Sequence, residues 1–214
     1  MGRSIAVLGL GKFGRSLAEN LYALGAEVMV VDRDAETVQD FASKSTAAIC
    51  ADLENEEEIL ALGIQNVDTV VVCMGSTLSA SVMCVVVARE LGIPYVMAKA
   101  SSPRMEAILK KVGADRIINP EAESGMRSAW MLASPNYLEV FDVDDNLAMV
   151  EMLPEKKWVG KSLRQLDLRS RYRVNVVATK KAGGSWLFVS PESPIEEGSH
   201  LLAVLEKKDL SRYQ

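Results

Sequence analysis

The stretch that decides the fold lies near the start of the chain and reads IAVLGLGKFG, residues 5–14. A short apolar run, typical of a buried strand, leads into the pattern Gly-x-Gly-x-x-Gly, and an amphipathic stretch follows it. In this context Gly9 permits a tight turn, Gly11 lets a phosphate group approach the backbone, and Gly14 lets the helix pack closely on the strand. The sequence therefore predicts a pyrophosphate site at the start of the first helix.

The second predicted strand ends in Asp32, about 20 residues beyond Gly11, where a carboxylate that accepts both ribose hydroxyls is expected. Asp32 would repel a 2′-phosphate, although Arg33 beside it weakens that repulsion, so NAD(H) or another adenine nucleotide is favoured over NADP. Lys12 has two interpretations, a solvated cation or a partner for phosphate. A domain that keeps these glycines only for packing is the alternative to a nucleotide site.

Outward from this motif, short apolar runs alternate with amphipathic stretches as far as residue 133. The predicted strands are Ile5–Leu8, Val28–Val31, Ala47–Cys50, Val70–Cys73, Tyr95–Ala98 and Arg116–Ile118. The predicted helices are Phe13–Leu24, Ala35–Ala42, Glu56–Leu62, Thr77–Leu91, Pro103–Val112 and Glu121–Ala133. Glycines stand where several of these helices should end, at Gly25, Gly63, Gly92 and Gly113. This alternation predicts an α/β domain with a doubly wound parallel sheet, at residues 1–134.

After residue 134 the pattern changes to that of a smaller mixed domain. The predicted strands there are Tyr137–Val143, Ala148–Leu153, Val174–Lys180, Trp186–Val189 and His200–Leu205. One short helix is predicted at Ser162–Leu166, and the pair Gly183-Gly184 predicts a hairpin turn. We expect residues 135–214 to form a small α+β domain.

Composition excludes several classes of protein. The chain has 214 residues, and its 24 Lys and Arg against 29 Asp and Glu give a net charge of −5, which argues against a broad nucleic-acid surface. The longest apolar runs, Val70–Met74 and Val82–Ala88, are far shorter than the about 20 residues of a membrane span. The N-terminus lacks a small-residue cleavage site, so a mature cytosolic protein is expected. Cys50, Cys73 and Cys84 are expected to be buried, reduced thiols.

Groups suited to hydride-transfer chemistry are sparse. His200, the single histidine, lies in a predicted strand of the second domain and is interpreted as a structural or surface residue. Tyr95 and Lys99 share one predicted strand, without the helical Tyr-x-x-x-Lys arrangement of a short-chain reductase. We therefore expect binding without turnover, not an enzyme, and a small NAD-dependent oxidoreductase is the alternative.

A series of motifs over nearly the whole chain carries a resemblance to a known family. The motifs are GLGKFG (9–14), VD (31–32), GADRIINPE (113–121), GKSLRQLDLR (160–169) and VNVVA (174–178). In this order they resemble the RCK family, most of all the cytosolic regulatory subunits of Ktr/Trk potassium uptake systems. The resemblance implies a nucleotide-binding RCK N-terminal domain, a C-terminal (TrkA-C) domain for ligand sensing and dimerisation, and dimers that assemble into an octameric ring.

The resemblance also implies which residues contact the nucleotide, ATP/ADP or NAD(H). Gly9, Gly14 and Arg33 belong to the predicted site as part of the motif or as a neighbour of Asp32. The positions that the resemblance places beside the phosphates, the ribose or the adenine are Gly11, Lys12, Phe13, Asp32, Asp52, Leu53, Gly75 and Ser76. Lys99 is implied to face the same cleft, beyond the carboxyl ends of the strands. Many family members have Arg where Lys12 stands, and Lys lacks the bidentate guanidinium fork.

Glu121 follows Pro120 at a predicted helix start, where the helix dipole by itself favours an acid. The resemblance adds a second role, a carboxylate near the phosphates that helps hold Mg²⁺ or Ca²⁺ across a dimer.

The second domain contains a candidate site for a different ligand. By pattern, Leu163, Leu166 and Leu168 fit a hydrophobic core. Related C-terminal domains bind cyclic di-AMP at their dimer interface through this apolar stretch, with an Arg and an Asn that match Arg169 and Asn175.

The function implied by the resemblance is regulatory. Bound nucleotide would switch a membrane-embedded potassium-translocating subunit, and the chain would lie at the inner face of the cell membrane through that partner, without inserting into the bilayer itself.

Overall fold

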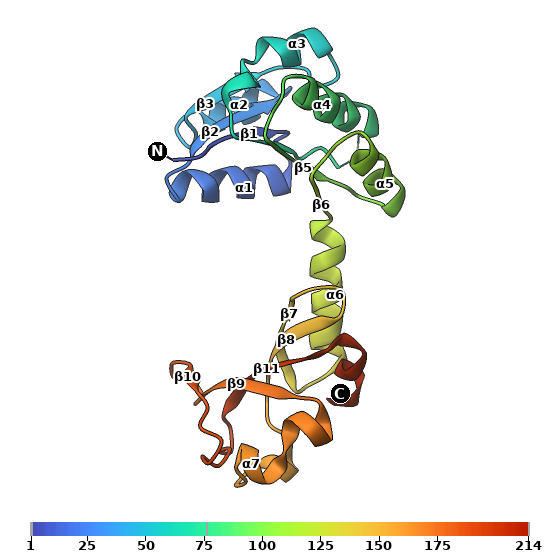
Figure 1. Cartoon of the computed structure of the whole chain (residues 1–214). Helices are drawn as coiled ribbons and strands as arrows, with labels where there is room; N and C mark the ends of the chain where they lie inside the picture. Colours follow the sequence, from blue (N-terminus) through green and yellow to red (C-terminus); the bar gives the residue numbers. More distant parts are fainter. Residues whose placement is uncertain (1, 76, 214) are drawn as a thin grey trace. The chain divides into compact units, whose positions relative to one another are not determined.

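The computed structural model describes residues 2–75 and 77–213, and the chain divides into two compact units, Met1–Glu121 and Ala122–Gln214 (Figure 1). The first unit contains a six-stranded parallel sheet in the order β3-β2-β1-β4-β5-β6. Its strands are β1 (Ser4–Leu8), β2 (Glu27–Asp32), β3 (Ala47–Cys50), β4 (Thr69–Val72), β5 (Tyr95–Lys99) and β6 (Arg116–Ile118). The predicted doubly wound α/β fold is confirmed.

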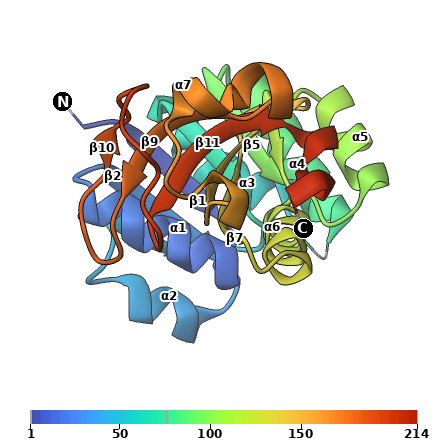
Figure 2. The same ribbon diagram turned by 90° about the horizontal axis from the view of Figure 1, so that it is seen from below.

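Helices cover both faces of this sheet (Figures 1 and 2). They are α1 (Lys12–Ala23), α2 (Ala35–Phe41), α3 (Glu56–Ala61), α4 (Leu78–Glu90) and α5 (Pro103–Lys111), with a short 3₁₀ turn η1 (Ile64–Asn66). Side chains of α1 and α2 pack with Val7, Val30 and Val71 on one face. Those of α3, α4 and α5 pack on the other face, toward which alternate strand residues such as Val70 and Val72 point. The sheet is buried on both faces, which explains why its strands are short continuous apolar runs.

The predicted helix ends are confirmed at the backbone level. The glycines expected to terminate helices all have positive φ values, from 73° at Gly92 to 113° at Gly113. The cysteine prediction is correct for Cys73 and Cys84, which are buried free thiols, and wrong for Cys50, which is exposed. Cys50 is the last residue of β3, and β3 is an edge strand, so no neighbouring strand covers it.

The second unit begins in α6 (Pro120–Ala133) and contains a five-stranded antiparallel sheet in the order β10-β9-β11-β8-β7. Its strands are β7 (Tyr137–Asp142), β8 (Leu147–Met152), β9 (Asn175–Lys180), β10 (Leu187–Phe188) and β11 (His200–Glu206). β9 and β10 pair antiparallel, and Gly183 in the connection has φ 73°, as the predicted hairpin turn requires.

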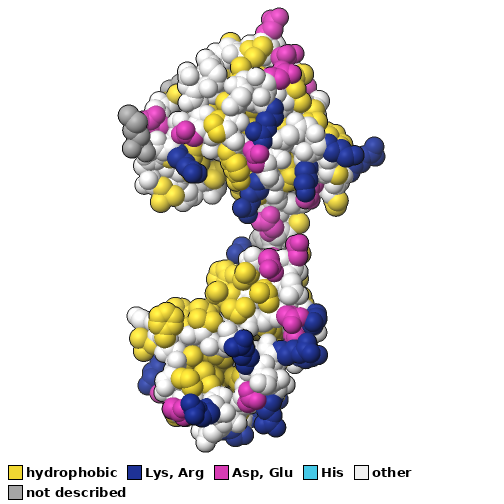
Figure 3. All heavy atoms as spheres, in the orientation of Figure 1, with side chains coloured by type: hydrophobic (Ala, Val, Ile, Leu, Met, Phe, Trp, Pro, Cys, Tyr) yellow, Lys and Arg dark blue, Asp and Glu magenta, His cyan; other side chains and the backbone are white. Residues whose placement is uncertain are grey.

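Short helical segments contribute to the core of the second unit, against which Trp130 of α6 also packs. These are η2 (Lys156–Trp158), α7 (Leu163–Leu166), η3 (Leu168–Tyr172) and η4 (Lys207–Tyr213). Only α7 was predicted, because segments of three to seven residues carry too little periodicity to be recognised. Trp158 is fully buried in this core, and its ring contacts those of Tyr172 and Tyr213. Hydrophobic side chains also gather on the surface of this unit (Figure 3).

Within residues 2–75 and 77–213, no helix is both long enough and apolar enough to cross a membrane.

Candidate functional site

The loop between β1 and α1 takes the conformation that its three glycines predict. Gly9 has φ 96°, and its N–H donates a 2.8 Å hydrogen bond to the carbonyl oxygen of Val31. A Cβ atom on Gly14 would lie 2.0 Å from the carbonyl oxygen of Gly9, so only glycine allows α1 to start this close to β1. Gly11, by contrast, has no described heavy atom within 4 Å of its Cβ position and faces open space.

The start of α1 leaves backbone N–H groups available to an anion. Gly11 is the residue before the helix, and among the described residues no side chain caps its N-terminus. Because the first N–H groups of a helix have no intrahelical acceptor, they are ready donors for a phosphate. Lys12 stands exposed on the same turn.

Asp32, at the end of β2, is oriented by the backbone around it. Its Oδ2 atom accepts a 2.6 Å hydrogen bond from the Leu10 N–H, and its Oδ1 atom accepts a 3.0 Å bond from the Asp34 N–H. The carboxylate is therefore held beside the glycine loop while it remains partly exposed. Its remaining lone pairs are available to a ligand.

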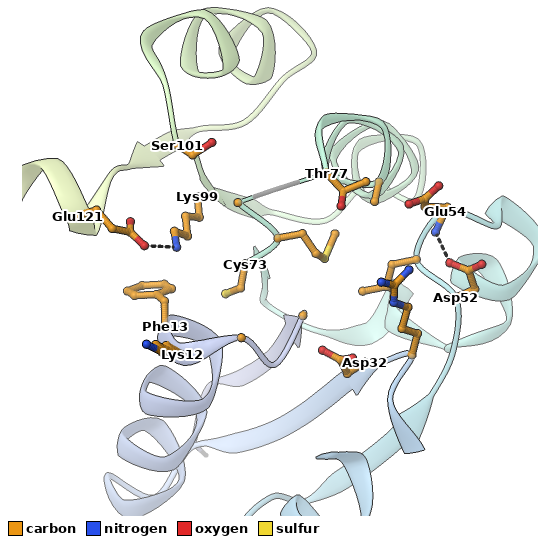
Figure 4. Close-up of a pocket in the computed structure, with 17 residues that line it drawn as sticks. Lys12, Phe13, Asp32, Asp52, Glu54, Cys73, Thr77, Lys99, Ser101 and Glu121 are labelled. Carbon is orange, nitrogen blue, oxygen red and sulfur yellow. Dashed lines mark hydrogen bonds and ion pairs between the residues drawn. The ribbon is translucent and has the colours of Figure 1, made fainter. Parts of the chain in front are cut away.

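These groups meet in a cavity of about 520 Å³ at the carboxyl ends of the parallel strands (Figure 4). The predicted residues that line it are Gly9, Gly11, Lys12, Phe13, Asp32, Arg33, Asp52, Leu53, Gly75, Lys99 and Glu121. Gly14 does not line the cavity, because it lies buried beneath the loop and acts through packing. Ser76 lies outside the described residues.

The sequence interpretation missed part of the lining. The additional residues are Glu54, Cys73, Met74, Thr77, Ala80 and Ser101. Most of them follow the ends of β3, β4 and β5, so extending the same carboxyl-end rule by a few residues could have found them. Burial raises the pKa of Cys73 to about 12, so its thiol stays protonated at neutral pH.

Charged groups divide between the two sides of the cavity. In Figure 4, Lys12, Lys99 and Glu121 lie on one side, whereas Asp52 and Glu54 lie on the other. The Lys99 Nζ and Glu121 Oε1 atoms are 2.6 Å apart. The hydrogen bond from Lys99 is the main cause that holds the pKa of Glu121 below its ordinary value, so this carboxyl is ionised at neutral pH.

A metal site is not formed by this chain alone. Within residues 2–75 and 77–213, no cluster of three or more His, Cys, Asp or Glu side chains could hold a metal ion. Glu121 is moreover occupied by the Lys99 ammonium. A divalent cation would need ligand oxygens from elsewhere, so the role of Glu121 toward Mg²⁺ or Ca²⁺ stays a prediction.

Four of the five residues considered for a second ligand lie together in the structure. Leu163, Leu168, Arg169 and Asn175 line a small cavity of about 120 Å³ in the second unit. Leu166 is buried in the core and does not line that cavity. Leu168 is also buried in the core, so its packing is explained without a ligand.

Residues weighed for hydride transfer do not converge. Tyr95 begins β5 and borders a depression with Arg3, whereas Lys99 ends the same strand and lines the large cavity. His200 lies in the second unit, where its Nδ1 atom is 2.6 Å from the Glu151 Oε1 atom. The cavity therefore lacks the histidine, and the tyrosine lies at the other end of its strand.

Comparison with known proteins covers both units of the chain. The TrkA-N domain model matches residues 5–120, and the TrkA-C domain model matches residues 147–214. The Ktr system potassium uptake protein A of Bacillus subtilis is 37% identical over 212 residues, which cover 99% of this chain and 96% of that protein. The protein of the same name from Vibrio alginolyticus is 30% identical, over 94% of this chain and 92% of its own length.

Solved structures share the fold. The GsuK RCK domain matches with a TM-score of 0.65 and 16% identity, over 98% of this chain and 46% of that one. The GsuK channel bound to NAD matches with a TM-score of 0.65 and 15% identity, over 98% of this chain and 38% of the channel chain.

Proposed function

We propose that this chain, which carries a TrkA-N and a TrkA-C domain and belongs to the family of the Ktr potassium uptake proteins, is the nucleotide-binding regulatory subunit of a potassium channel or transporter. The observation that carries the proposal is the cavity of about 520 Å³ on which the glycine loop, Asp32, Lys12 and Lys99 converge. Its volume is within the usual range for a small-molecule site.

The cavity supports a definite orientation for the ligand. The ribose would bind Asp32, and the phosphates would extend over Gly11 toward Lys12 and the first turn of α1. The base would then lie beside Leu53 and Gly75, on the side of Asp52. ATP/ADP and NAD(H) both fit this pattern, and NAD is the ligand of the GsuK channel structure that shares the fold.

A regulatory role accounts for the cavity better than catalysis does. Hydride transfer needs a proton donor or acceptor near the cofactor. His200 is in the other unit, and the depression that Tyr95 borders is separate from the cavity that Lys99 lines. The relatives are potassium uptake proteins, so neither they nor the site favours the oxidoreductase alternative.

Regulation requires a membrane partner and an assembly with two states. We infer a homodimer, assembled into an octameric ring, that docks on an integral-membrane potassium-translocating subunit at the cytoplasmic face. The exposed apolar side chains of the second unit, among them Phe141, Leu187 and Phe188, support a role in self-association. Nucleotides shift the gate only if they bind its open and closed states with different affinity.

Two further ligands remain predictions under this function. Mg²⁺ or Ca²⁺ would be shared between Glu121 and the phosphates. Cyclic di-AMP would contact Leu163, Arg169 and Asn175 around the small cavity of the second unit.

The test is binding followed by flux. Isothermal titration of the full-length chain with ATP, ADP, NADH and NADPH should give saturable binding, weakest for NADPH. Potassium flux in vesicles that contain the cognate membrane subunit should then change with the ATP/ADP or NADH/NAD ratio. No binding of any of these nucleotides, or flux that ignores both ratios, would refute the proposal, and turnover of NADH with a carbonyl substrate would favour the oxidoreductase.

A further inference from the structure

The cations around the large cavity are not equivalent. Lys12 and Arg33 are exposed and, in the part of the chain that the structure describes, neither forms an ion pair. Lys99, in contrast, already has an anion, the Glu121 carboxylate at 2.6 Å (Figure 4). The cavity therefore contains one cation that a ligand can reach only in competition with the protein itself.

The position of Lys99 is tightly restricted. Its side chain is only 12% exposed. A Cβ atom on Gly75 would lie 3.2 Å from Lys99 Cε and 3.4 Å from Nζ, so the end of the side chain runs against the Gly75 backbone. The ammonium points to Glu121, and Lys99 also lines the cavity.

Glu121 is far more exposed to solvent than Lys99. Its side chain is 67% exposed, and it stands in the first turn of α6, where the helix dipole stabilises an anion without Lys99. Losing the pair consequently costs Glu121 little, since water and the helix N-terminus remain to solvate it. The contact is thus well suited to open and close.

We propose that the Lys99–Glu121 ion pair is an internal competitor for the terminal phosphates of the nucleotide, so that ligand phosphate displaces the Glu121 carboxylate from the Lys99 ammonium. This inference rests on the proposed nucleotide-binding function and adds a regulatory step to the same site. Lys99 lies on the side of the cavity with Lys12, where the phosphates are expected, and away from Asp52 (Figure 4). Ligands with more phosphate groups displace the carboxylate more completely, which biases the site toward triphosphates.

The test is isothermal titration of the full-length chain with ATP and AMP in EDTA, which removes divalent cations. Glu121→Gln frees Lys99, and we expect it to tighten ATP binding about 2- to 5-fold, the upper part of the range for breaking a partly exposed ion pair. AMP binding should change less than about 2-fold. Glu54→Gln is the matched control, because it removes one negative charge from the opposite side of the same cavity without touching an ion pair.

A second variant separates the ion pair from a general charge effect. In a Lys99→Met background, Glu121→Gln should give no further gain in ATP affinity, because the ammonium group for which carboxylate and phosphate compete is absent. An equal gain from Glu54→Gln, a gain that persists without Lys99, or no gain at all would overturn the inference. If the unaltered chain binds no nucleotide, the proposed function itself is wrong, whereas binding that is indifferent to Glu121 overturns only the competition.

Discussion

Gly14 and Gly11 belong to one motif, but we expect alanine at Gly14 to lower the stability of the fold and alanine at Gly11 to lower the affinity for ATP. At Gly14 a methyl group would meet backbone, the Gly9 carbonyl oxygen at 2.0 Å and the carbonyl carbon at 3.1 Å, with Cys73 Cβ at 3.3 Å behind them. Backbone cannot rotate away as a side chain can, so α1 would have to move from β1 by roughly 1 Å. Overpacking of this kind destabilises a protein by about 1–3 kcal/mol.

Gly11→Ala is the matched control for stability. No described atom lies within 4 Å of the new methyl group, and the backbone at φ −65° suits any residue. Alanine is a poorer residue than glycine before a helix, by roughly 0.5–1 kcal/mol, which is about what the loss of unfolded-state freedom returns. The methyl group would, however, occupy the space through which a phosphate approaches, so ATP affinity should fall about 10-fold or more.

Thermal unfolding by circular dichroism and titration with ATP distinguish the two outcomes. For a unit of this size, 1–3 kcal/mol lowers the unfolding midpoint by roughly 4–12 °C. Gly14→Ala should show this shift, while Gly11→Ala should unfold within about 2 °C of the unaltered chain and lose affinity. An unchanged midpoint for Gly14→Ala would refute the close approach of α1 to β1, and unchanged affinity for Gly11→Ala would remove the loop from the ligand's path.

Three further predictions concern other groups. Asp32→Ala should weaken NADH binding at least about 10-fold and reduce the preference over NADPH, which paired titrations would measure; an unchanged preference would exclude Asp32 from ribose recognition. Burial raises the pKa of Asp115, but bonds from the Val96 N–H and Arg89 outweigh this and leave it lowered, so its stabilisation is present above about pH 4 and lost as pH falls through the folded-state pKa. Asp115→Asn should therefore flatten the decline of unfolding free energy in acid, and an unchanged slope would contradict this. Arg169→Ala should abolish any heat of cyclic di-AMP binding to the full-length chain, whereas persistent binding would exclude the cavity at Leu163.

The sheet of the first unit could be predicted because local and global signals agree there. A strand buried on both faces must be apolar throughout, and a glycine is often needed where the chain turns at the end of a helix. Both features are therefore visible in the local sequence. The turns η2, η3 and η4 have no such local feature. In η4, for example, the Tyr137 hydroxyl donates to the Leu210 carbonyl and the Ser134 hydroxyl donates to the Tyr213 carbonyl. Contacts across more than 70 residues are not visible in local patterns.

The site could be predicted as a set of residues but not as a set of contacts. The family resemblance implies that Lys99 and Glu121 lie near one bound nucleotide, and both line the same cavity. It assigns each of them to a ligand and cannot show that, 22 residues apart, they bind each other. This contact changes the energetics of binding, because the affinity of the site becomes the difference between phosphate and carboxylate as partners of one ammonium group. A regulatory site gains from such a balance, since small differences between ligands then decide which partner Lys99 takes.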